Sequence, residues 1–213
     1  MELNGNEAST MRRANAPIFK KYGLTKSEIV SAIVTLAILV LLVLEIFIMV
    51  TCEGTYVIDR SMYPTLNGAP AEKIKGGDYI IINKYDKPDY GDIVVVYNER
   101  ERKNIIKRAV AFGGDTVEMR EGVLYLNGQR QEESYLDRNN ITPTAEVNNF
   151  PPYEVEAGCI FLLGDNRDES VDSRARMAKN SEGFKLSDVK GVVTTWSMAI
   201  KPVLTGIYTL FNF

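Results

Sequence analysis

Residues 78–97 read DYIIINKYDKPDYGDIVVVY, and this stretch decides the class of fold. Two runs rich in isoleucine, valine and tyrosine flank a short segment that contains proline, aspartate and glycine. β-Branched and aromatic residues favour strands, whereas the intervening residues favour a turn. The stretch therefore predicts two β-strands joined by a turn.

Runs of the same kind continue toward the C-terminus: NIIKRAVAF, TVEM, VLYL, CIFLL and GVVTTW. Helical periodicity is hard to find among them, and Asn127-Gly128 after VLYL predicts a tight hairpin. Residues 131–152 are polar and predict one or two long surface loops that add nothing to a core. Residues 51–213 are therefore expected to form one mostly β domain of antiparallel sheets.

An apolar run precedes this domain. Residues 29–50 read IVSAIVTLAILVLLVLEIFIMV, and a helix needs about 20 such residues to cross a bilayer. Buried core helices are usually shorter and amphipathic, and the run is too long for the apolar part of an ordinary cleaved signal peptide. The sequence predicts a cytoplasmic segment over 1–28, a transmembrane helix over 29–50 and an extracytoplasmic domain over 51–213.

Basic residues before the span set the expected orientation. They are Arg12, Arg13, Lys20, Lys21 and Lys26. Because positive charges stay on the cytoplasmic side, the N-terminus is expected in the cytoplasm and the domain outside the plasma membrane. The last apolar stretch, residues 202–213, is too short to span as a helix, and both a final strand and an interfacial segment fit it.

Composition removes several classes of function. The chain contains no histidine, which excludes Ser-His-Asp and Cys-His catalysis and the commonest nitrogen ligand for metals. The formal net charge of -3 gives no electrostatic attraction for a nucleic acid, so nucleic-acid binding is not expected. Cys52 and Cys159 lie in unlike contexts and are interpreted as small apolar residues rather than a disulfide or metal site. No metal and no cofactor is expected.

Two residues suggest a base other than histidine. Ser61 lies in RSMYPTL, before a proline-containing turn, where a serine is usually only a turn residue. Lys107 lies in the strand run NIIKRAVAF beside Arg108, and neighbours on a strand point to opposite faces. Only one of the two can then be an exposed charge. A lysine that faces inward loses hydration, so its pKa falls and its amine becomes a usable base for a serine hydroxyl.

The third segment of interest is GDNRDESVDSR, residues 164–174. A calcium loop is one interpretation, but Arg167 then places a cation at a ligand position. A self-paired polar loop near a site fits better.

SMYPTL, GDIVVVY, KRAVAFGGDTV and GDNRDESVDSR, in this order behind an N-terminal span, resemble the bacterial type I signal peptidases, and the single short span resembles their Gram-positive members. The resemblance implies a Ser-Lys serine protease with Ser61 as nucleophile, Lys107 as general base and Ser170 as the hydroxyl that holds the lysine amine. It implies that Arg108 pairs with Asp165, that Asp172 and Arg174 brace the loop that carries Ser170, and that Met62 lines the substrate groove.

One position departs from the family pattern. Asp59 lies two residues before Ser61, where many relatives have Ser, Thr or Gly. A carboxylate there would repel an oxyanion, although the backbone N–H of Ser61 could still serve if Asp59 turns aside. The departure bears on efficiency rather than on class.

The resemblance further implies cleavage of signal peptides from exported preproteins after small residues of the Ala-x-Ala type, at the surface of the lipid bilayer. A self-cleaving repressor shares the dyad but is soluble and carries DNA-binding segments, sortase-like chemistry needs histidine, and the eukaryotic type replaces the lysine by histidine. A catalytically inactive, membrane-tethered domain that binds leader peptides is the rival from a different class, and Asp59 is the feature that favours it.

Overall fold

The computed structural model describes residue 23 and residues 25–69, 77–179 and 182–211. It separates into two compact units, Met1–Val50 and Thr51–Phe213. The described part of the first unit is helix α3, Lys26–Thr51, whose first turn is closed by hydrogen bonds exchanged between Thr25 and Glu28. Among the described residues, α3 is the only helix with the length and composition to cross a membrane.

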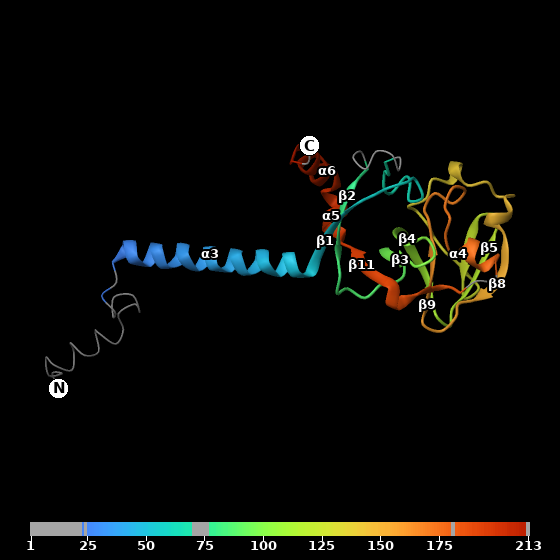
Figure 1. Ribbon diagram of the computed structural model, residues 1–213, viewed down its shortest axis with the longest axis horizontal. Coiled ribbons are helices and arrows are strands. Elements are labelled where there is room, and N and C mark those ends of the chain that lie inside the picture. Colours follow the sequence, from blue (N-terminus) through green and yellow to red (C-terminus); the bar gives the residue numbers. More distant parts are fainter. Residues whose placement is uncertain (1–22, 24, 70–76, 180–181, 212–213) are drawn as a thin grey trace, which may run out of the picture. The chain divides into compact units, whose positions relative to one another are not determined.

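A seven-stranded antiparallel sheet forms the larger part of the second unit, with strand order β1-β2-β11-β3-β4-β9-β10. Its strands are β1 (Cys52–Tyr56), β2 (Tyr79–Asn83), β3 (Ile93–Asn98), β4 (Lys103–Phe112), β9 (Cys159–Leu163), β10 (Phe184–Lys185) and β11 (Val189–Val193). Figure 1 shows β3, β4 and β9 in the middle of this unit, with β1 and β2 toward one end.

A four-stranded antiparallel sheet packs beside the first, in the order β7-β6-β5-β8. Its strands are β5 (Thr116–Arg120), β6 (Val123–Leu126), β7 (Gln129–Arg130) and β8 (Phe150–Glu154). Asn127 and Gly128 both have positive φ, of 50° and 77°, and join β6 to β7. The predicted hairpin is present, with the two left-handed residues that a two-residue connection needs.

Three short helices follow the strands or lie between them: α4 (Ser173–Met177), α5 (Thr195–Ala199) and α6 (Lys201–Phe211). The strand predicted from GVVTTW is shorter than expected, since it ends at Val193 and its last residues enter α5. The C-terminal segment is a helix and not a final strand, and Lys201, Thr205 and Tyr208, at helical spacing along it, contact Asp78 and Tyr79 at the start of β2.

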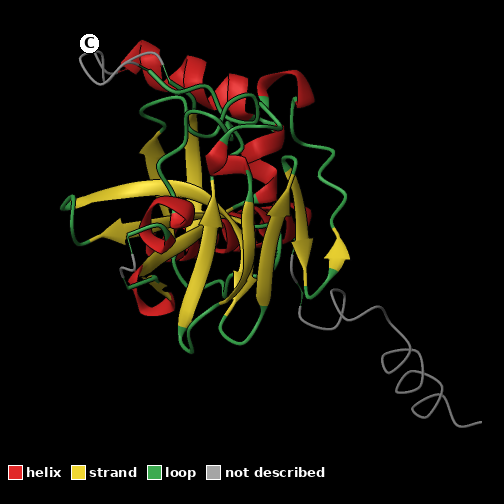
Figure 2. Cartoon of the chain, turned by 90° about the vertical axis from the view of Figure 1, so that its right-hand side faces the viewer, coloured by secondary structure: helices red, strands yellow, loops and turns green. Residues whose placement is uncertain are grey.

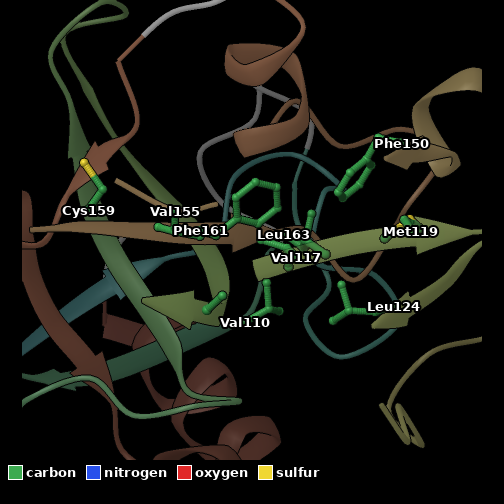
Figure 3. Close-up of a cluster of buried hydrophobic side chains, with 10 residues drawn as sticks. Val110, Val117, Met119, Leu124, Phe150, Val155, Cys159, Phe161 and Leu163 are labelled. Atoms are coloured by element: carbon green, nitrogen blue, oxygen red, sulfur yellow. The ribbon is translucent and has the colours of Figure 1, made fainter. Parts of the chain in front are cut away.

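The core between the sheets gathers side chains from both of them. Val110 of β4, Val117 of β5 and Phe161 of β9 point toward one another in Figure 3, and Phe150 joins them from β8. Strands thus form most of the body, with short helices around them (Figure 2). The expectation of a mostly β, antiparallel domain behind an apolar helix is confirmed.

The polar stretch over 131–152 does more than the sequence predicted. It contains the single turns η1 (Arg138–Asn140) and η2 (Glu146–Asn148), and it buries Leu136, Ile141 and Phe150. The expectation that it adds nothing to the core is therefore wrong. Its few apolar residues are too widely spaced to show a period, so only the folded domain reveals that they face inward.

Candidate active site

A tight turn directly after β1 carries Ser61. Tyr63 N donates to Arg60 O at 3.1 Å and Leu66 N donates to Met62 O at 2.9 Å, so residues 60–66 form compact successive turns. The isolated bridge between Ile58 and Ala69 closes the base of this turn. The serine is consequently held on a rigid element beside the large sheet.

Strand β4 brings Lys107 to this turn. Lys107 Nζ donates to Ser61 Oγ at 2.7 Å and to the Ile106 carbonyl at 3.1 Å. Lys107 is only 3% exposed, because the Ser61 turn covers its face of the sheet. Ser61 and Lys107 are 46 residues apart in the sequence, and the fold places them within one hydrogen bond.

Arg108 is buried as well, on the opposite face of the sheet. The sequence indicated that only one of these two neighbours could be an exposed charge; in the structure neither is exposed, because both faces of β4 are covered. The ring of Tyr135 lies 3.7 Å from the Arg108 guanidinium, and Asp165 accepts bonds of 2.8 and 2.6 Å from it. The guanidinium is therefore fully paired despite its burial.

Burial lowers the pKa of Lys107 below the ordinary value of 10.5, because the ammonium form loses its hydration. The carboxylates of Asp59 and Asp172 oppose this shift, since a nearby negative charge favours the ammonium form. Desolvation outweighs both of them at the lysine, while Asp59 accepts a bond from the Ser61 N–H and Asp172 pairs with the Arg174 guanidinium. A neutral amine within hydrogen-bond distance of a hydroxyl can accept its proton.

The loop after β9 is hydrogen-bonded to the turn that carries Ser61. Asn166 N donates to the Ser61 carbonyl at 3.0 Å, and Asn166 Nδ2 donates to the Arg60 carbonyl at 3.1 Å. Asp165, which binds Arg108, also accepts a 2.6 Å bond from Thr65 Oγ1. One aspartate thus connects β4 to the serine turn.

Ser170 lies in this loop, but its hydroxyl does not hold Lys107. Ser170 Oγ is buried and has no hydrogen-bond partner in the described structure, and the lysine amine takes the Ile106 carbonyl as its second partner. Ser170 Oγ and the Ser61 carbonyl oxygen lie close to the backbone of Gly164, and a side chain at this position would collide with both of them. The bond implied by the family resemblance is absent from this arrangement of the described residues.

Asp172 and Arg174 form a buried ion pair in the loop that carries Ser170. The carboxylate accepts from Arg174 Nε and Nη2 at 2.9 and 2.8 Å and from the Gly164 backbone N–H at 3.0 Å. Arg174 also donates to the Arg167 carbonyl at 2.8 Å. The pair ties the two ends of the loop together.

Sequence reasoning missed the residues that support this loop from outside. Glu133 binds Arg167 with bonds of 2.6 and 3.1 Å, and both side chains are buried. Asn148 donates to Asp168 at 2.6 Å and accepts from Arg174 at 2.8 Å. One general rule pointed to such a contact, because a buried arginine needs an acidic partner. Nothing in the sequence of the polar loop indicated that Glu133 is the partner of Arg167.

Asp59 does not turn aside. Its Oδ1 accepts a 2.8 Å hydrogen bond from the backbone N–H of Ser61, and its own φ of 70° lies in the left-handed region. That N–H is the donor that would stabilise an oxyanion formed at Ser61. In this arrangement the carboxylate occupies the donor.

A cavity of about 430 Å³ opens over Ser61 and Lys107, and Asp59, Ile105 and Val171 are among its lining residues. A second one of about 280 Å³ adjoins it and shares Asp59, Lys103 and Ile105. Met62 lines neither of them, because it is 1% exposed and packs in the core with Leu66 and Ile80. No group of acidic and sulfur ligands suited to a metal occurs among the described residues.

Comparisons with known proteins show the family of the chain. A family model described as signal peptidase, peptidase S26, matches residues 27–197. Signal peptidase I of Bacillus licheniformis is 32% identical over 171 residues, which cover 78% of this chain and 86% of that protein. Signal peptidase I P of Bacillus subtilis subsp. natto is 32% identical over 184 residues, covering 82% and 92%. A crystal structure of a signal peptidase I from Enterococcus faecalis V583 matches 51% of this chain and 98% of its own at 32% identity, with a TM-score of 0.42.

The structure is a mostly β domain behind an apolar helix, and in it a serine contacts a buried lysine. The chain belongs to the signal peptidase family, peptidase S26. It is a hydrolase of the signal peptidase I type.

Proposed function

We propose that this chain is a membrane-anchored serine endopeptidase that removes signal peptides from exported preproteins, with Ser61 as nucleophile and Lys107 as general base. The 2.7 Å contact between Lys107 Nζ and Ser61 Oγ, made by a buried lysine with a lowered pKa, carries this proposal. With α3 crossing the plasma membrane and the N-terminus in the cytoplasm, the domain over 51–213 works on the outer side, where preproteins emerge.

The proposed reaction proceeds through an acyl-enzyme. Neutral Lys107 accepts the hydroxyl proton as Ser61 Oγ attacks the scissile carbonyl, and the resulting ammonium protonates the leaving amine. Water then enters and attacks the ester carbonyl as it loses a proton to the same amine, and the ammonium returns that proton to Ser61 Oγ as the signal peptide leaves. The lysine is neutral again at the end of each cycle.

Substrate binding follows from the cavity over the dyad. The two adjoining cavities beside β1 and β4 offer room for an extended peptide along the strand edges. We expect small side chains, as in Ala-x-Ala, at the first and third positions before the cut. The anchor raises the effective concentration of membrane-bound preprotein at the site.

Supporting roles follow from the contacts around the dyad. Arg108 and Asp165 hold β4 against the serine turn, and Asp172 with Arg174 holds the loop of Ser170. Ser170 is proposed to bind the lysine amine once substrate fills the cavity, since its hydroxyl lacks another partner among the described residues.

The test is cleavage of a purified preprotein with an Ala-x-Ala leader end, in detergent. Wild type should cut after the leader alanine, whereas Ser61→Ala and Lys107→Ala should lose activity by a factor of about 10³ or more, as for loss of a nucleophile or its base. Lys107→Arg keeps the charge but cannot act as a base, so it should be as inactive as Lys107→Ala. Activity in Lys107→Arg would contradict the proposed base.

A second function is favoured by one observation, the bond from Ser61 N–H to Asp59. If that bond persists with substrate present, the domain would bind leader peptides without cutting them. Wild-type protein that binds a leader peptide but leaves it intact, and still does so as Asp59→Gly, would establish this binding function in place of the proposed protease.

A further inference from the structure

Two opposite charges, Asp59 and Lys103, lie between the two cavities beside the dyad. Both residues line the larger cavity and the smaller one. Ile105, the third residue that the cavities share, lies on the same face of β4 as Lys103 and Lys107, because alternate residues of a strand share a face. A peptide that uses both cavities must therefore pass Asp59 and Lys103 next to the nucleophile.

The position of Asp59 in the substrate-free structure opposes catalysis. Its carboxylate accepts the 2.8 Å bond from the Ser61 N–H, which an oxyanion formed at Ser61 would need as a donor. The carboxylate would also place one negative charge beside another as the oxyanion develops, and this repulsion grows once substrate has excluded water. An active arrangement therefore needs another partner for Asp59, and a cation is the strongest partner for a carboxylate.

Lys103 is the basic residue best placed to become that partner. Its Nζ lies 2.7 Å from a carboxylate oxygen of Glu101, in the turn between β3 and β4, and the two side chains are 57% and 43% exposed. An ion pair this exposed contributes little stability, so Lys103 can leave Glu101 easily. The other basic residues that line the larger cavity are engaged, since Lys107 binds Ser61 and the Arg60 guanidinium lies over an aromatic ring.

The charges of Asp59 and Lys103 already interact in the substrate-free structure. The hydrogen bond to Glu101 raises the pKa of Lys103 above its ordinary value of 10.5, partial burial opposes the rise, and the charge of Asp59 adds to it. Lys103 is therefore an ammonium at neutral pH. A peptide that fills both cavities would exclude water around Asp59 and Lys103, and the attraction between them would grow as the local dielectric constant falls. Glu101 lines only the larger cavity, so its bond to Lys103 gains less.

We propose that Lys103 is a positioning residue for the oxyanion donor: when substrate binds, its ammonium exchanges Glu101 for Asp59 and draws this carboxylate away from the Ser61 N–H. The freed N–H then donates to the oxygen of the scissile carbonyl. Asp59 and Lys103 are both exposed before substrate covers them, so neither side chain is held in place by packing. This inference rests on the proposed protease function and adds to it a rearrangement that precedes the attack by Ser61.

The test is single-turnover cleavage of an Ala-x-Ala leader peptide by full-length protein in detergent, with Lys103→Met in the wild-type and Asp59→Gly backgrounds. Rates are taken on the plateau above the acid limb, because the charge of Lys103 adds to burial in lowering the pKa of Lys107. We expect Lys103→Met to lower the maximal rate by about tenfold, less than the 10² to 10³ of a fully lost oxyanion donor, with little change in peptide affinity. In the Asp59→Gly background it should have no effect, since no carboxylate remains to be moved. Lys103→Arg keeps the cation and should restore most of the rate.

The outcomes separate this inference from the proposed protease. A tenfold loss that persists in the Asp59→Gly background, or equal rates for Lys103→Met and wild type, would overturn the inference and leave the protease standing. If no protein of the set cuts the peptide, the proposed protease fails and the inference fails with it. Glu101→Gln is the matched control, because it removes the substrate-free partner of Lys103 but keeps Asp59. Its rate should equal or exceed that of wild type, and a tenfold fall would assign the effect to the Glu101 pair instead.

Discussion

Asp59 controls the serine turn through a single hydrogen bond to Ser61 N. Asp59→Gly frees this donor and suits the positive φ, whereas Asp59→Asn removes the charge but keeps an acceptor. A lost oxyanion donor costs about 10² to 10³ in kcat, so we expect Asp59→Gly to raise kcat by up to that factor. Single-turnover cleavage of one leader peptide by both variants measures it. Equal rates in wild type and Asp59→Gly would mean that substrate already displaces the carboxylate.

The pH profile should report the pKa of Lys107. Below that pKa the amine is an ammonium and cannot accept the serine proton, so activity should appear as pH rises through it. Because burial lowers the pKa, the midpoint of the acid limb should fall below 10.5. Asp59 raises this pKa, so Asp59→Asn should move the midpoint to lower pH. A pH series of kcat/KM for both proteins checks the direction, and a shift to higher pH would contradict it.

Ser170 should show opposite effects on stability and activity. Its buried hydroxyl lacks a hydrogen bond in the described structure, which costs about 1–3 kcal/mol. Ser170→Ala should therefore stabilise the substrate-free protein by about 1 kcal/mol. The same variant should cut more slowly, because the proposed bond from the hydroxyl to Lys107 in the presence of substrate is lost. Thermal unfolding in detergent and kcat are compared with those of Ser173→Ala, whose hydroxyl accepts a bond from Leu162 N and whose loss should destabilise.

At the scale of elements, the polar stretch over 131–152 supports the loop that follows β9. Glu133 forms a salt bridge with buried Arg167, and the ring of Tyr135 stacks against the Arg108 guanidinium. Glu133→Ala leaves Arg167 uncompensated and should cost about 3–5 kcal/mol of unfolding free energy. The double variant Glu133→Leu/Arg167→Met should recover most of it, since apolar residues can replace a buried pair. Chemical denaturation of the three proteins measures this, and a single variant as stable as wild type would show that water reaches Arg167.

At the scale of the whole molecule, the first unit should matter for access to substrate and not for chemistry. Removing Met1–Val50 leaves the compact unit Thr51–Phe213 with every proposed catalytic group. Cleavage of a short leader peptide in detergent should stay within about twofold of wild type, whereas cleavage of vesicle-bound preprotein should fall by about 10² because the effective concentration is lost. Parallel assays of the two proteins test this, and equal losses on both substrates would mean that the first unit supports the fold.

Local patterns predicted much of this protein. The apolar run that became α3 and the Asn127-Gly128 hairpin depend on side-chain type and spacing within a few residues, which sequence displays directly. The absence of histidine is a matter of composition alone, and it excluded most alternatives for a base. The mostly β class followed from valine and isoleucine runs, whose preference for strands is a local property.

Only the tertiary structure decided the rest, because it depends on contacts between distant segments. It buries Lys107 and Arg108 together, connects Asp59 to Ser61 N–H, leaves Ser170 without a partner among the described residues and places Glu133 against Arg167. It also turns a C-terminal segment of undecided structure into a helix with one face docked and one exposed. Desolvation, pairing and exposure are properties of a three-dimensional environment, and the order of residues along the chain does not contain them.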